Sequence, residues 1–428
     1  MPKSDGSDYN LPAQFLRVCK QRMRSVKVTD SMSGEMTGAD LLLRTLVLRR
    51  LFLRHVLKPD ERFVGVLLPP SNGAIMANMA LSLSRRTAVN LNYTVTSEVM
   101  NACIKQAGIA HVITSRRVMS KLNLELDAEV VYLEDLKDKP TTGDKIAAAV
   151  GAYVLPSGVL AATLGLGKIH ADDVATVIFT SGSTGTPKGV MLTYANVSSN
   201  VGAINEVIRL TEDDVLVGVL PFFHSFGYTV TMWSVMSLNI RGAYHFDPLS
   251  ARAVGQLIEK TKGTMLLATP TFLRSYLRRC KPEDLKSLDV VVAGAEKLPV
   301  ELCDAFEEKF GIRPVEGYGA TELSPLVSVN LPASRAGDEH RREGTVGRPV
   351  PNVRAKIVSL ETGEVLPTGE PGMLKITGPN VMKGYLGRED LTSKVLHEGW
   401  YETGDVALLD ADGFIKITGR QSRFSKIG

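Results

Sequence analysis

The chain contains little cysteine and little histidine. Its four cysteines, Cys19, Cys103, Cys280 and Cys303, lie far apart, at spacings that fit neither a metal site nor a disulfide framework. Its seven histidines form no cluster, so we expect no zinc site. These absences favour a protein of a reducing, cytoplasmic compartment.

The chain also lacks a strong charge bias and a secretory leader. It has 50 lysines and arginines against 46 aspartates and glutamates, a formal charge of +4 that is too small over 428 residues to indicate nucleic-acid binding. Residues 1–10 are polar, and residues 11–27 carry several basic side chains. We therefore expect neither a nucleic-acid partner nor secretion.

Long hydrophobic runs are absent, with one exception. Residues 146–167 carry no charge and are numerous enough to cross a bilayer, but Pro156, Ser157 and four glycines interrupt them. We interpret this run as a connection between core elements. A membrane-anchored scaffold and a looser peripheral membrane contact, which would give a membrane-associated location, remain as alternatives.

In the first three quarters of the chain, helical patterns alternate with short β-branched runs. A helix is predicted over residues 40–57, and we interpret its four arginines as a solvated face rather than a membrane-facing stripe. Strands are predicted at 64–68, 110–114, 174–180, 215–220, 264–268 and 289–293. Such alternation is typical of βαβ units, so we predict a doubly wound α/β fold with a mostly parallel sheet.

The sequence changes character after about residue 344. Short strands are predicted at 355–359, 373–377, 406–409 and 414–418, with turns at Thr362-Gly363 and Asp412-Gly413. We predict a small antiparallel β-barrel or sheet over residues 344–418, packed on the α/β part formed by residues 1–343.

Residues 180–189 have the composition of a loop that binds phosphate. Glycines allow a tight turn whose N–H groups converge on one anion, hydroxyls add donors, and Lys188 adds a positive charge. The loop is not a Walker A motif, because Pro187 stands where that motif requires glycine and Lys188 is followed by glycine rather than by serine or threonine. A P-loop ATPase is therefore disfavoured.

This loop resembles the phosphate-binding motif of the adenylate-forming superfamily, which includes acyl-CoA synthetases, adenylation domains of peptide synthetases and luciferases. Further stretches follow in that family's order, at residues 221–227, 294–296, 317–322, 401–405 and 417–420. The resemblance implies two stacked doubly wound α/β subdomains, a β-barrel, ATP or AMP and Mg²⁺ as cofactors, and a mobile C-terminal lid. We expect this chain to be the large N-terminal part, with the hinge to the missing lid starting at residues 419–428, and to turn over poorly by itself.

The family resemblance also implies a role for each matching residue. The catalytic candidates are Lys188, Thr184, Glu322 and His224. Glu322 and Thr184 are the candidate ligands of Mg²⁺, and Asp405 is expected to accept hydrogen bonds from the ribose hydroxyls. Tyr318 is expected to stack on adenine. The expected nucleotide-binding residues are Thr180, Ser181, Gly182, Ser183, Thr184, Gly185, Lys188, Gly294, Ala295, Glu296, Glu316, Gly317, Tyr318, Gly319, Thr321, Asp405, Ile417 and Arg420.

The absence of an acidic residue from the expected acid-binding stretch predicts the class of acid substrate. Relatives that activate amino acids use an aspartate to bind the ammonium group, but residues 222–230 contain no acidic residue. Residues 318–330 and 422–428 most resemble bacterial acyl-acyl-carrier-protein synthetases, including the synthetase part of the bifunctional lysophospholipid acyltransferase. We therefore expect a long-chain fatty acid, positioned by His224 and passed to acyl carrier protein or coenzyme A. An aryl acid ligase and a non-catalytic nucleotide- or acyl-binding module are the alternatives.

Overall fold

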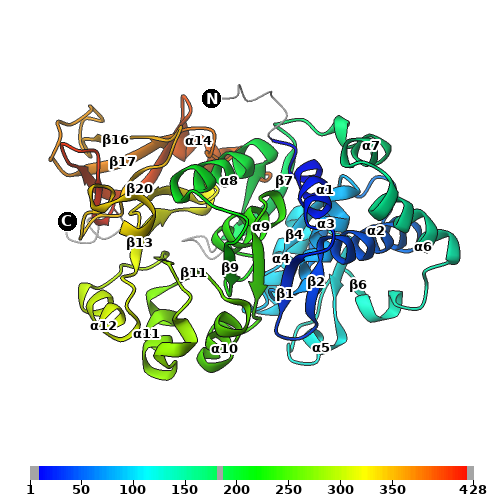
Figure 1. Ribbon diagram of the computed structural model, residues 1–428. Coiled ribbons are helices and arrows are strands. Elements are labelled where there is room, and N and C mark those ends of the chain that lie inside the picture. Colours follow the sequence, from blue (N-terminus) through cyan, green and yellow to red (C-terminus); the bar gives the residue numbers. More distant parts are fainter. Residues whose placement is uncertain (1–8, 181–186, 422–428) are drawn as a thin grey trace.

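The computed structural model describes residues 9–180 and 187–421, and these form three sheets covered by helices. In Figure 1 the smallest sheet lies at one end of the molecule, and α6 (Thr142–Ala149) and α7 (Ser157–Thr163) lie at the opposite end. The two larger sheets lie between these ends. This arrangement confirms the predicted α/β fold with an additional β-rich part.

The first large sheet has seven strands, in the order β18-β8-β7-β4-β3-β5-β6. Neighbours from β7 to β6 are parallel, whereas β8 runs antiparallel to β7 and β18 antiparallel to β8. In chain order these strands are β3 (Phe63–Val66), β4 (Thr87–Asn90), β5 (His111–Thr114), β6 (Glu129–Tyr132), β7 (Val174–Thr180), β8 (Lys188–Thr193) and β18 (Gly384–Tyr385).

The second large sheet has nine strands, in the order β15-β14-β13-β12-β11-β9-β10-β1-β2. Its central strands are parallel, and antiparallel strands close both edges. Its members are β1 (Val26–Asp30), β2 (Gly34–Thr37), β9 (Val215–Gly218), β10 (Arg241–Tyr244), β11 (Met265–Ala268), β12 (Val290–Ala293), β13 (Val315–Gly319), β14 (Leu326–Val329) and β15 (Arg348–Pro349).

The third sheet is antiparallel and corresponds to the predicted β-barrel region. Its path is β16-β17-β20-β19, and β21 also pairs with β20. The strands are β16 (Arg354–Val358), β17 (Gly372–Thr377), β19 (Leu396–His397), β20 (Trp400–Leu409) and β21 (Ile415–Arg420). β20 begins six residues before the strand predicted at 406–409, so Asp405 lies inside a strand.

Helices cover the sheets and connect their strands. The α-helices not yet given are α1 (Leu11–Gln21), α2 (Gly38–His55), α3 (Asn72–Leu83), α4 (Ser97–Ala107), α5 (Arg116–Met119), α8 (Tyr194–Ile208), α9 (Ser234–Ser237), α10 (Ala251–Thr261), α11 (Pro270–Arg279), α12 (Val300–Phe310), α13 (Ala333–Ala336) and α14 (Glu389–Val395). The 3-10 and π-helical segments are η1 (Leu133–Leu136), η2 (Val150–Val154), η3 (Leu166–Lys168), η4 (Phe226–Trp233), η5 (Pro282–Leu285), η6 (Thr321–Leu323) and η7 (Asp338–His340).

Local sequence explains where these elements begin and what they bury. Thr37 and Asp40 form a capping box that starts α2, and Thr193 and Asn196 form another at α8. All four residues of β12 are buried, as expected for a parallel strand that is covered on both faces. The four cysteines are free thiols, and all four are buried.

The charge-free run at 146–167 does not form one helix. It consists of the end of α6, then η2, α7 and η3. Across the described ranges, no helix combines the length and the apolar character needed to cross a bilayer. The arginines of α2 are largely engaged with protein groups, since Arg50 and Arg54 bind Asp144 and Arg49 donates to the carbonyl of Leu83.

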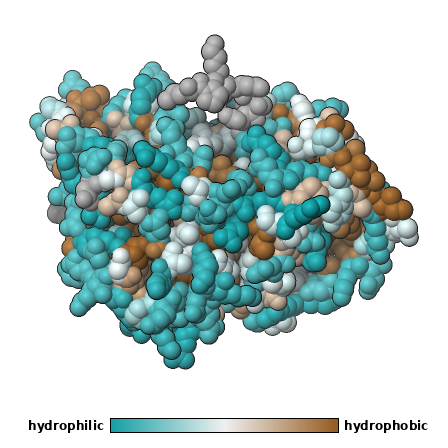
Figure 2. All heavy atoms as spheres, viewed as in Figure 1, coloured by the Kyte–Doolittle hydropathy of each residue, from teal (hydrophilic) through white to brown (hydrophobic). Residues whose placement is uncertain are grey.

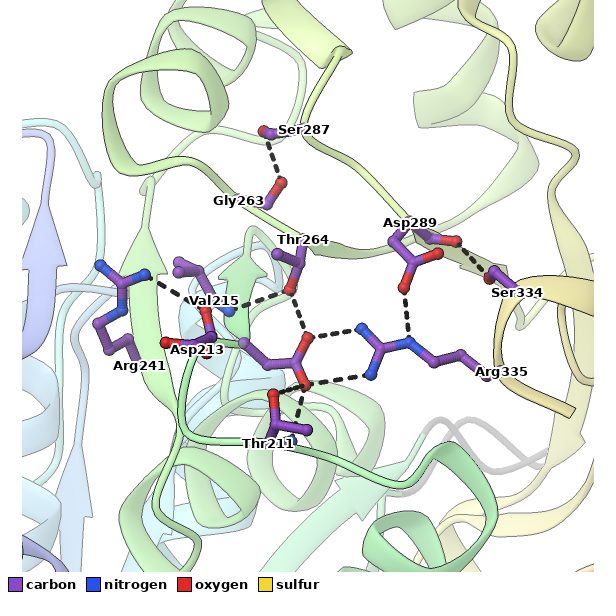
Figure 3. A network of polar contacts seen from close by, with 11 residues as sticks. Thr211, Asp213, Val215, Arg241, Gly263, Thr264, Ser287, Asp289, Ser334 and Arg335 are labelled. Atoms are coloured by element: carbon purple, nitrogen blue, oxygen red, sulfur yellow. Dashed lines mark hydrogen bonds and ion pairs between the residues drawn. The ribbon is translucent and has the colours of Figure 1, made fainter.

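A polar network fixes the amino-terminal edge of the nine-stranded sheet (Figure 3). Asp214, just before β9, is buried and accepts hydrogen bonds from Arg335 at 2.6 Å and from the Thr264 hydroxyl at 2.8 Å. Arg335 in α13 also binds Asp289, just before β12, at 2.6 Å. This network therefore joins strand starts that are far apart in the sequence, on the edge opposite to the candidate site.

Candidate functional site

Four of the six sequence motifs come together at the carboxyl ends of parallel strands. Thr180 ends β7, residues 221–227 follow β9, residues 294–296 follow β12, and the turn at 317–322 ends β13. Ligands of open α/β sheets bind at this edge. The fold therefore gathers residues from Thr180 to Glu322, up to 142 positions apart, around one region.

In the sequence, the phosphate-loop motif runs from the end of β7 to the start of β8, and these two strands pair antiparallel. Thr180 and Lys188 are partners across this hairpin, and Pro187 is buried beside them. The Lys188 ammonium lies 5.3 Å from the centre of the Tyr385 ring. Five predicted phosphate-binding residues lie outside the described residues, namely Ser181, Gly182, Ser183, Thr184 and Gly185.

Tyr318, Asp405 and Arg420 form a hydrogen-bonded cluster. The Tyr318 hydroxyl donates to one oxygen of Asp405 at 2.6 Å, and Arg420 Nε donates to the other at 2.7 Å. Asp405 and Arg420 are opposite each other in the β20–β21 pairing, so strand register brings this pair together. Burial, and then the neighbouring Asp405 charge, raises the pKa of Tyr318 well above its ordinary value, so its phenol remains a proton donor. Ile417, opposite Ala407, is half-buried in the same pairing.

Glu322 and Tyr385 form a second contact beside this cluster. The Tyr385 hydroxyl donates to Glu322 Oε1 at 2.8 Å, and the Met382 N–H donates to the Glu322 carbonyl at 2.8 Å. Burial, and then the Glu322 charge, raises the pKa of Tyr385. Because β18 pairs with β8, Tyr385 lies between Glu322 and Lys188.

The turn from Tyr318 to Glu322 contacts all three sheets. Tyr318 reaches Asp405 in the five-stranded sheet, and Glu322 reaches Tyr385 in the seven-stranded sheet. Between them, Thr321 accepts a long hydrogen bond of 3.4 Å from Ser225, which follows β9. The turn is tight, because a Cβ at Gly319 would lie 2.1 Å from the Pro325 carbonyl oxygen.

The residues after β12 line the next part of this edge. Gly294 is buried, and a Cβ on it would lie 3.1 Å from the Phe226 ring. Ala295 has a left-handed φ of 69°, and the exposed Glu296 accepts a hydrogen bond of 2.8 Å from Thr271. Glu316 accepts a longer bond of 3.3 Å from the Leu298 N–H, and burial raises its pKa. Gly317 is a strand partner of Val329.

A cavity of about 210 Å³ opens beside Thr180 and His224. Its walls are mainly apolar, and its lining residues are Asn90, Leu91, Asn92, Val95, Val99, Met100, Cys103, Phe179, Thr180, Pro187, Phe223 and His224. The exposed His224 stands at this cavity, and partial desolvation lowers the pKa of its imidazole. The following segment, η4, is a π-helix, a form that is frequent at functional sites.

The structure adds residues that the motifs did not indicate. Tyr385 binds Glu322, and Thr271 binds Glu296, although neither residue lies in one of the six motifs read from the sequence. Only strand pairing and helix placement bring them to the site. Across the described ranges, no group of three or more histidines, cysteines, aspartates or glutamates is placed to bind a metal ion.

Comparison with known protein families identifies the class. Residues 15–386 match the family model described as AMP-binding enzyme, so the chain belongs to this family. The match includes the hairpin of Thr180 and Lys188, the turn at 318–322 and Tyr385.

Individual relatives share parts of this chain. A long-chain-fatty-acid–CoA ligase of Bacillus subtilis is 34% identical over 259 residues, which cover 58% of this chain and 44% of the relative. A 4-coumarate–CoA ligase of Pinus taeda is 33% identical over 267 residues, covering 60% of this chain and 49% of the relative. This chain therefore spans about half the length of these curated relatives.

Solved structures share the fold over nearly the whole chain. The ATP-bound crystal structure of MatB from Rhodopseudomonas palustris is 25% identical, with a TM-score of 0.75, and the match covers 96% of this chain and 79% of that structure. The fold and the family are thus established independently of the site geometry.

Proposed function

We propose that this chain binds ATP and a carboxylic acid as part of an adenylate-forming ligase. The observation that carries the proposal is the turn from Tyr318 to Glu322, which joins Asp405, Tyr385 and the β9 edge at one place. Membership of the AMP-binding family and the ATP held by the similar MatB structure support a nucleotide as the ligand. A non-catalytic binding module is less well supported, because Lys188, Glu322 and Asp405 are all retained.

The proposed reaction begins with attack by a carboxylate oxygen on the α-phosphorus of ATP. A bond forms between that oxygen and phosphorus, the bond to the bridging oxygen of pyrophosphate breaks, and acyl-AMP and pyrophosphate result. The negative charge that builds up on the departing phosphates needs a cation beside it. Lys188, the basic residue of the phosphate-loop motif at the start of β8, is assigned to supply this cation.

Asp405 is assigned to the ribose. A carboxylate has about four acceptor sites, and Tyr318 and Arg420 use one on each oxygen. The remaining sites suit the two ribose hydroxyls, which donate charge-assisted hydrogen bonds. Arg420 holds the carboxylate in place, and Tyr318 contributes a ring beside it for contact with adenine.

Glu322 is assigned to Mg²⁺, since carboxylate oxygens are preferred ligands of this hard cation and substrate phosphates commonly complete its coordination. A bound Mg²⁺ would neutralise phosphate charge. Tyr385 orients the Glu322 carboxylate by donating to Oε1. His224, whose pKa is lowered, is neutral at pH 7 and is assigned to positioning the acid rather than to removing a proton from it.

A long-chain fatty acid is the proposed substrate. The cavity beside His224 is mainly apolar, and the B. subtilis relative carries a fatty-acid ligase name. The 4-coumarate ligase of P. taeda supports an aryl acid as the second candidate. The acyl acceptor is proposed to be coenzyme A or acyl carrier protein; the names of both relatives favour coenzyme A.

Stable mimics of acyl-AMP, with a sulfamoyl group in place of the phosphate, would test this function without requiring turnover. We expect the hexadecanoyl mimic to bind more tightly than the 4-coumaroyl mimic, with a gain of up to ~0.8 kcal/mol for each methylene that the pocket accepts. Calorimetry would give both affinities. Tighter binding of the 4-coumaroyl mimic would support the aryl acid instead. If no acyl mimic binds more tightly than AMP, the proposed function is wrong.

A further inference from the structure

The segment from α6 through η2 to α7 exposes an apolar surface at one end of the molecule. It holds five of the eleven large hydrophobic side chains that are exposed in the described part of the chain. These five are Ile146 (60% exposed), Val150 (40%), Tyr153 (51%), Val154 (70%) and Val159 (51%), and we call them the α6–α7 face. Figure 2 shows a continuous hydrophobic band where Figure 1 places α7 and α6. Contiguous apolar surfaces of this kind mark interaction sites, whereas single exposed side chains do not.

The inner side of this segment is firmly anchored to the protein. Ala148, Gly151 and Ala152 are buried, and Gly151 packs so closely that a Cβ on it would lie 2.9 Å from Leu46 in α2. Lys20 of α1 donates to the carbonyls of Gly151 and Ala152 at 3.0 and 2.5 Å. The apolar side chains therefore point outward from a fixed support.

The elements packed against the α6–α7 face carry more basic than acidic residues. In α1, α2, α6 and η3 there are eight lysines and arginines and two aspartates, and four of these basic residues also bind protein groups, namely Lys20, Arg49, Arg50 and Arg54. Both aspartates are engaged in capping boxes, and buried Asp144 also binds Arg50 and Arg54. Exposed Lys145 and Lys168 stand at the two ends of a stretch that contains no charge at all.

We propose that the α6–α7 face docks on the surface of a membrane that contains anionic phospholipid. Apolar side chains flanked by basic residues fit the boundary between headgroups and acyl chains. Ile146, Val150, Tyr153 and Val154 recur at spacings of three or four residues, so they lie on one side of α6 and η2 and enter that boundary together. Lys145 and Lys168 reach the lipid phosphates.

Charge favours a membrane over a second copy of this chain as the occupant. A twofold dimer through this face would bring the same basic surroundings together from both protomers. Like charges that face each other oppose association. An anionic bilayer matches both the apolar centre and the positive charge around it.

Co-sedimentation with vesicles tests this surface directly. We expect the 428-residue protein to bind phosphatidylglycerol–phosphatidylcholine vesicles more strongly than pure phosphatidylcholine vesicles. The variant I146E/V154E/V159E should lose at least ~10-fold in binding. The variant K145Q/K168Q should lose about fivefold for each lysine removed, and less at high salt. The matched control L249E/V365E changes side chains that are 56% and 64% exposed elsewhere and should bind like the unaltered protein.

Three outcomes would overturn the proposal. The first is that the unaltered protein does not bind anionic vesicles. The second is that the control variant loses as much binding as I146E/V154E/V159E. The third is that analytical ultracentrifugation shows a dimer of the unaltered protein that only I146E/V154E/V159E dissociates. Circular dichroism and AMP binding by each variant check that the fold is retained. Vesicle binding is measured without nucleotide or acid. It therefore tests the membrane proposal even if the proposed ligase function is wrong.

Discussion

The Arg335 side chain connects the starts of two strands of the nine-stranded sheet, β9 and β12. It binds Asp214 before β9 and Asp289 before β12, and it comes from α13, after β14 (Figure 3). Asp214 is almost completely buried, so its charge depends on this partner and on nearby hydroxyl and N–H groups. Removing one partner of a buried ion pair costs far more than removing one on the surface.

We predict that Arg335→Ala destabilises the fold by about 3 kcal/mol, because Asp214 would keep its hydrogen bonds but lose its cation. Urea denaturation at pH 7 would measure the change. Arg388→Ala is a suitable control, since Arg388 and Asp390 form an exposed pair whose removal we expect to change stability very little. Equal losses in the two variants would contradict this account.

The same ion pair predicts a pH dependence. Burial by itself raises the pKa of Asp214, but Arg335 and the hydrogen bonds from Thr211 and Thr264 outweigh burial and lower it. A lowered folded-state pKa gives stability that is present above the unfolded pKa of about 3.9 and is lost as pH falls through the folded value. The stability difference between the unaltered protein and Arg335→Ala should stay constant from about pH 7 to 5 and shrink below about pH 4. A difference that grows on acidification would rule this out.

Single residues of the site were predictable only where they carry a motif. Tyr318, Asp405 and Arg420 follow from the sequence as candidates, but their mutual hydrogen bonds depend on the register of β20 with β21. Tyr385 could not be found, because nothing around it suggests chemistry and only the pairing of β18 with β8 brings it to Glu322. Tertiary pairing of this kind leaves no local pattern in the sequence.

Among the elements, the end of β13 and the turn that follows it are what the candidate site most depends on. At Gly319 an added Cβ would lie 2.1 Å from the Pro325 carbonyl oxygen. Because this oxygen belongs to the backbone, it cannot move away as the end of a flexible side chain can. At Gly317 the nearest atoms would lie 3.5 Å away, which is ordinary contact. Gly317 and Gly319, two residues apart, therefore differ sharply in whether a Cβ atom fits.

Gly319→Ala should therefore destabilise the protein by about 2 kcal/mol or more, whereas Gly317→Ala should cost under about 1 kcal/mol. Urea denaturation of both variants would test this. Similar stability of Gly319→Ala and the unaltered protein would show that the turn is looser than its geometry indicates.

The cavity wall on α4 offers a test of substrate length. Val99 is half-buried and lines the cavity of about 210 Å³. We predict that Val99→Phe shortens the longest acyl chain that an acyl-AMP mimic can carry without losing affinity, because the larger ring fills the pocket. AMP itself should bind unchanged, and Val99→Ala should not shorten the tolerated chain. An unchanged chain-length profile in Val99→Phe would place the acid elsewhere.

Element boundaries show where local patterns fail. The alternation of helices and β-branched runs predicted the positions of β3, β5, β7, β9, β11 and β12, since strands of a parallel sheet are continuous buried runs. The start of β20 was missed, because residues 401–405 are polar and contain Gly404 with a φ of 75°. Cross-strand pairing with β17 and β21 overrides that weak local preference.

At the scale of the whole molecule, the site exists because three sheets converge on one turn. The fold class follows from the order of predicted elements, but strand order does not, since β1 lies beside β10 and β18 beside β8. Such neighbours are 200 or so residues apart and are chosen by packing. The sequence motifs therefore indicated which residues are candidates for binding, and the convergence of the sheets explains how these candidates come to lie together.

The most direct test of the account is AMP binding to the 428-residue protein and to Asp405→Ala, measured by calorimetry. Loss of charge-assisted hydrogen bonds to the ribose should weaken AMP by about 1.5 to 3 kcal/mol, or roughly 10- to 150-fold. The control Asp412→Ala, in an exposed turn that binds Arg342, should leave the affinity unchanged. If the unaltered protein does not bind AMP, or if Asp405→Ala binds it equally well, the nucleotide site is not where this account places it.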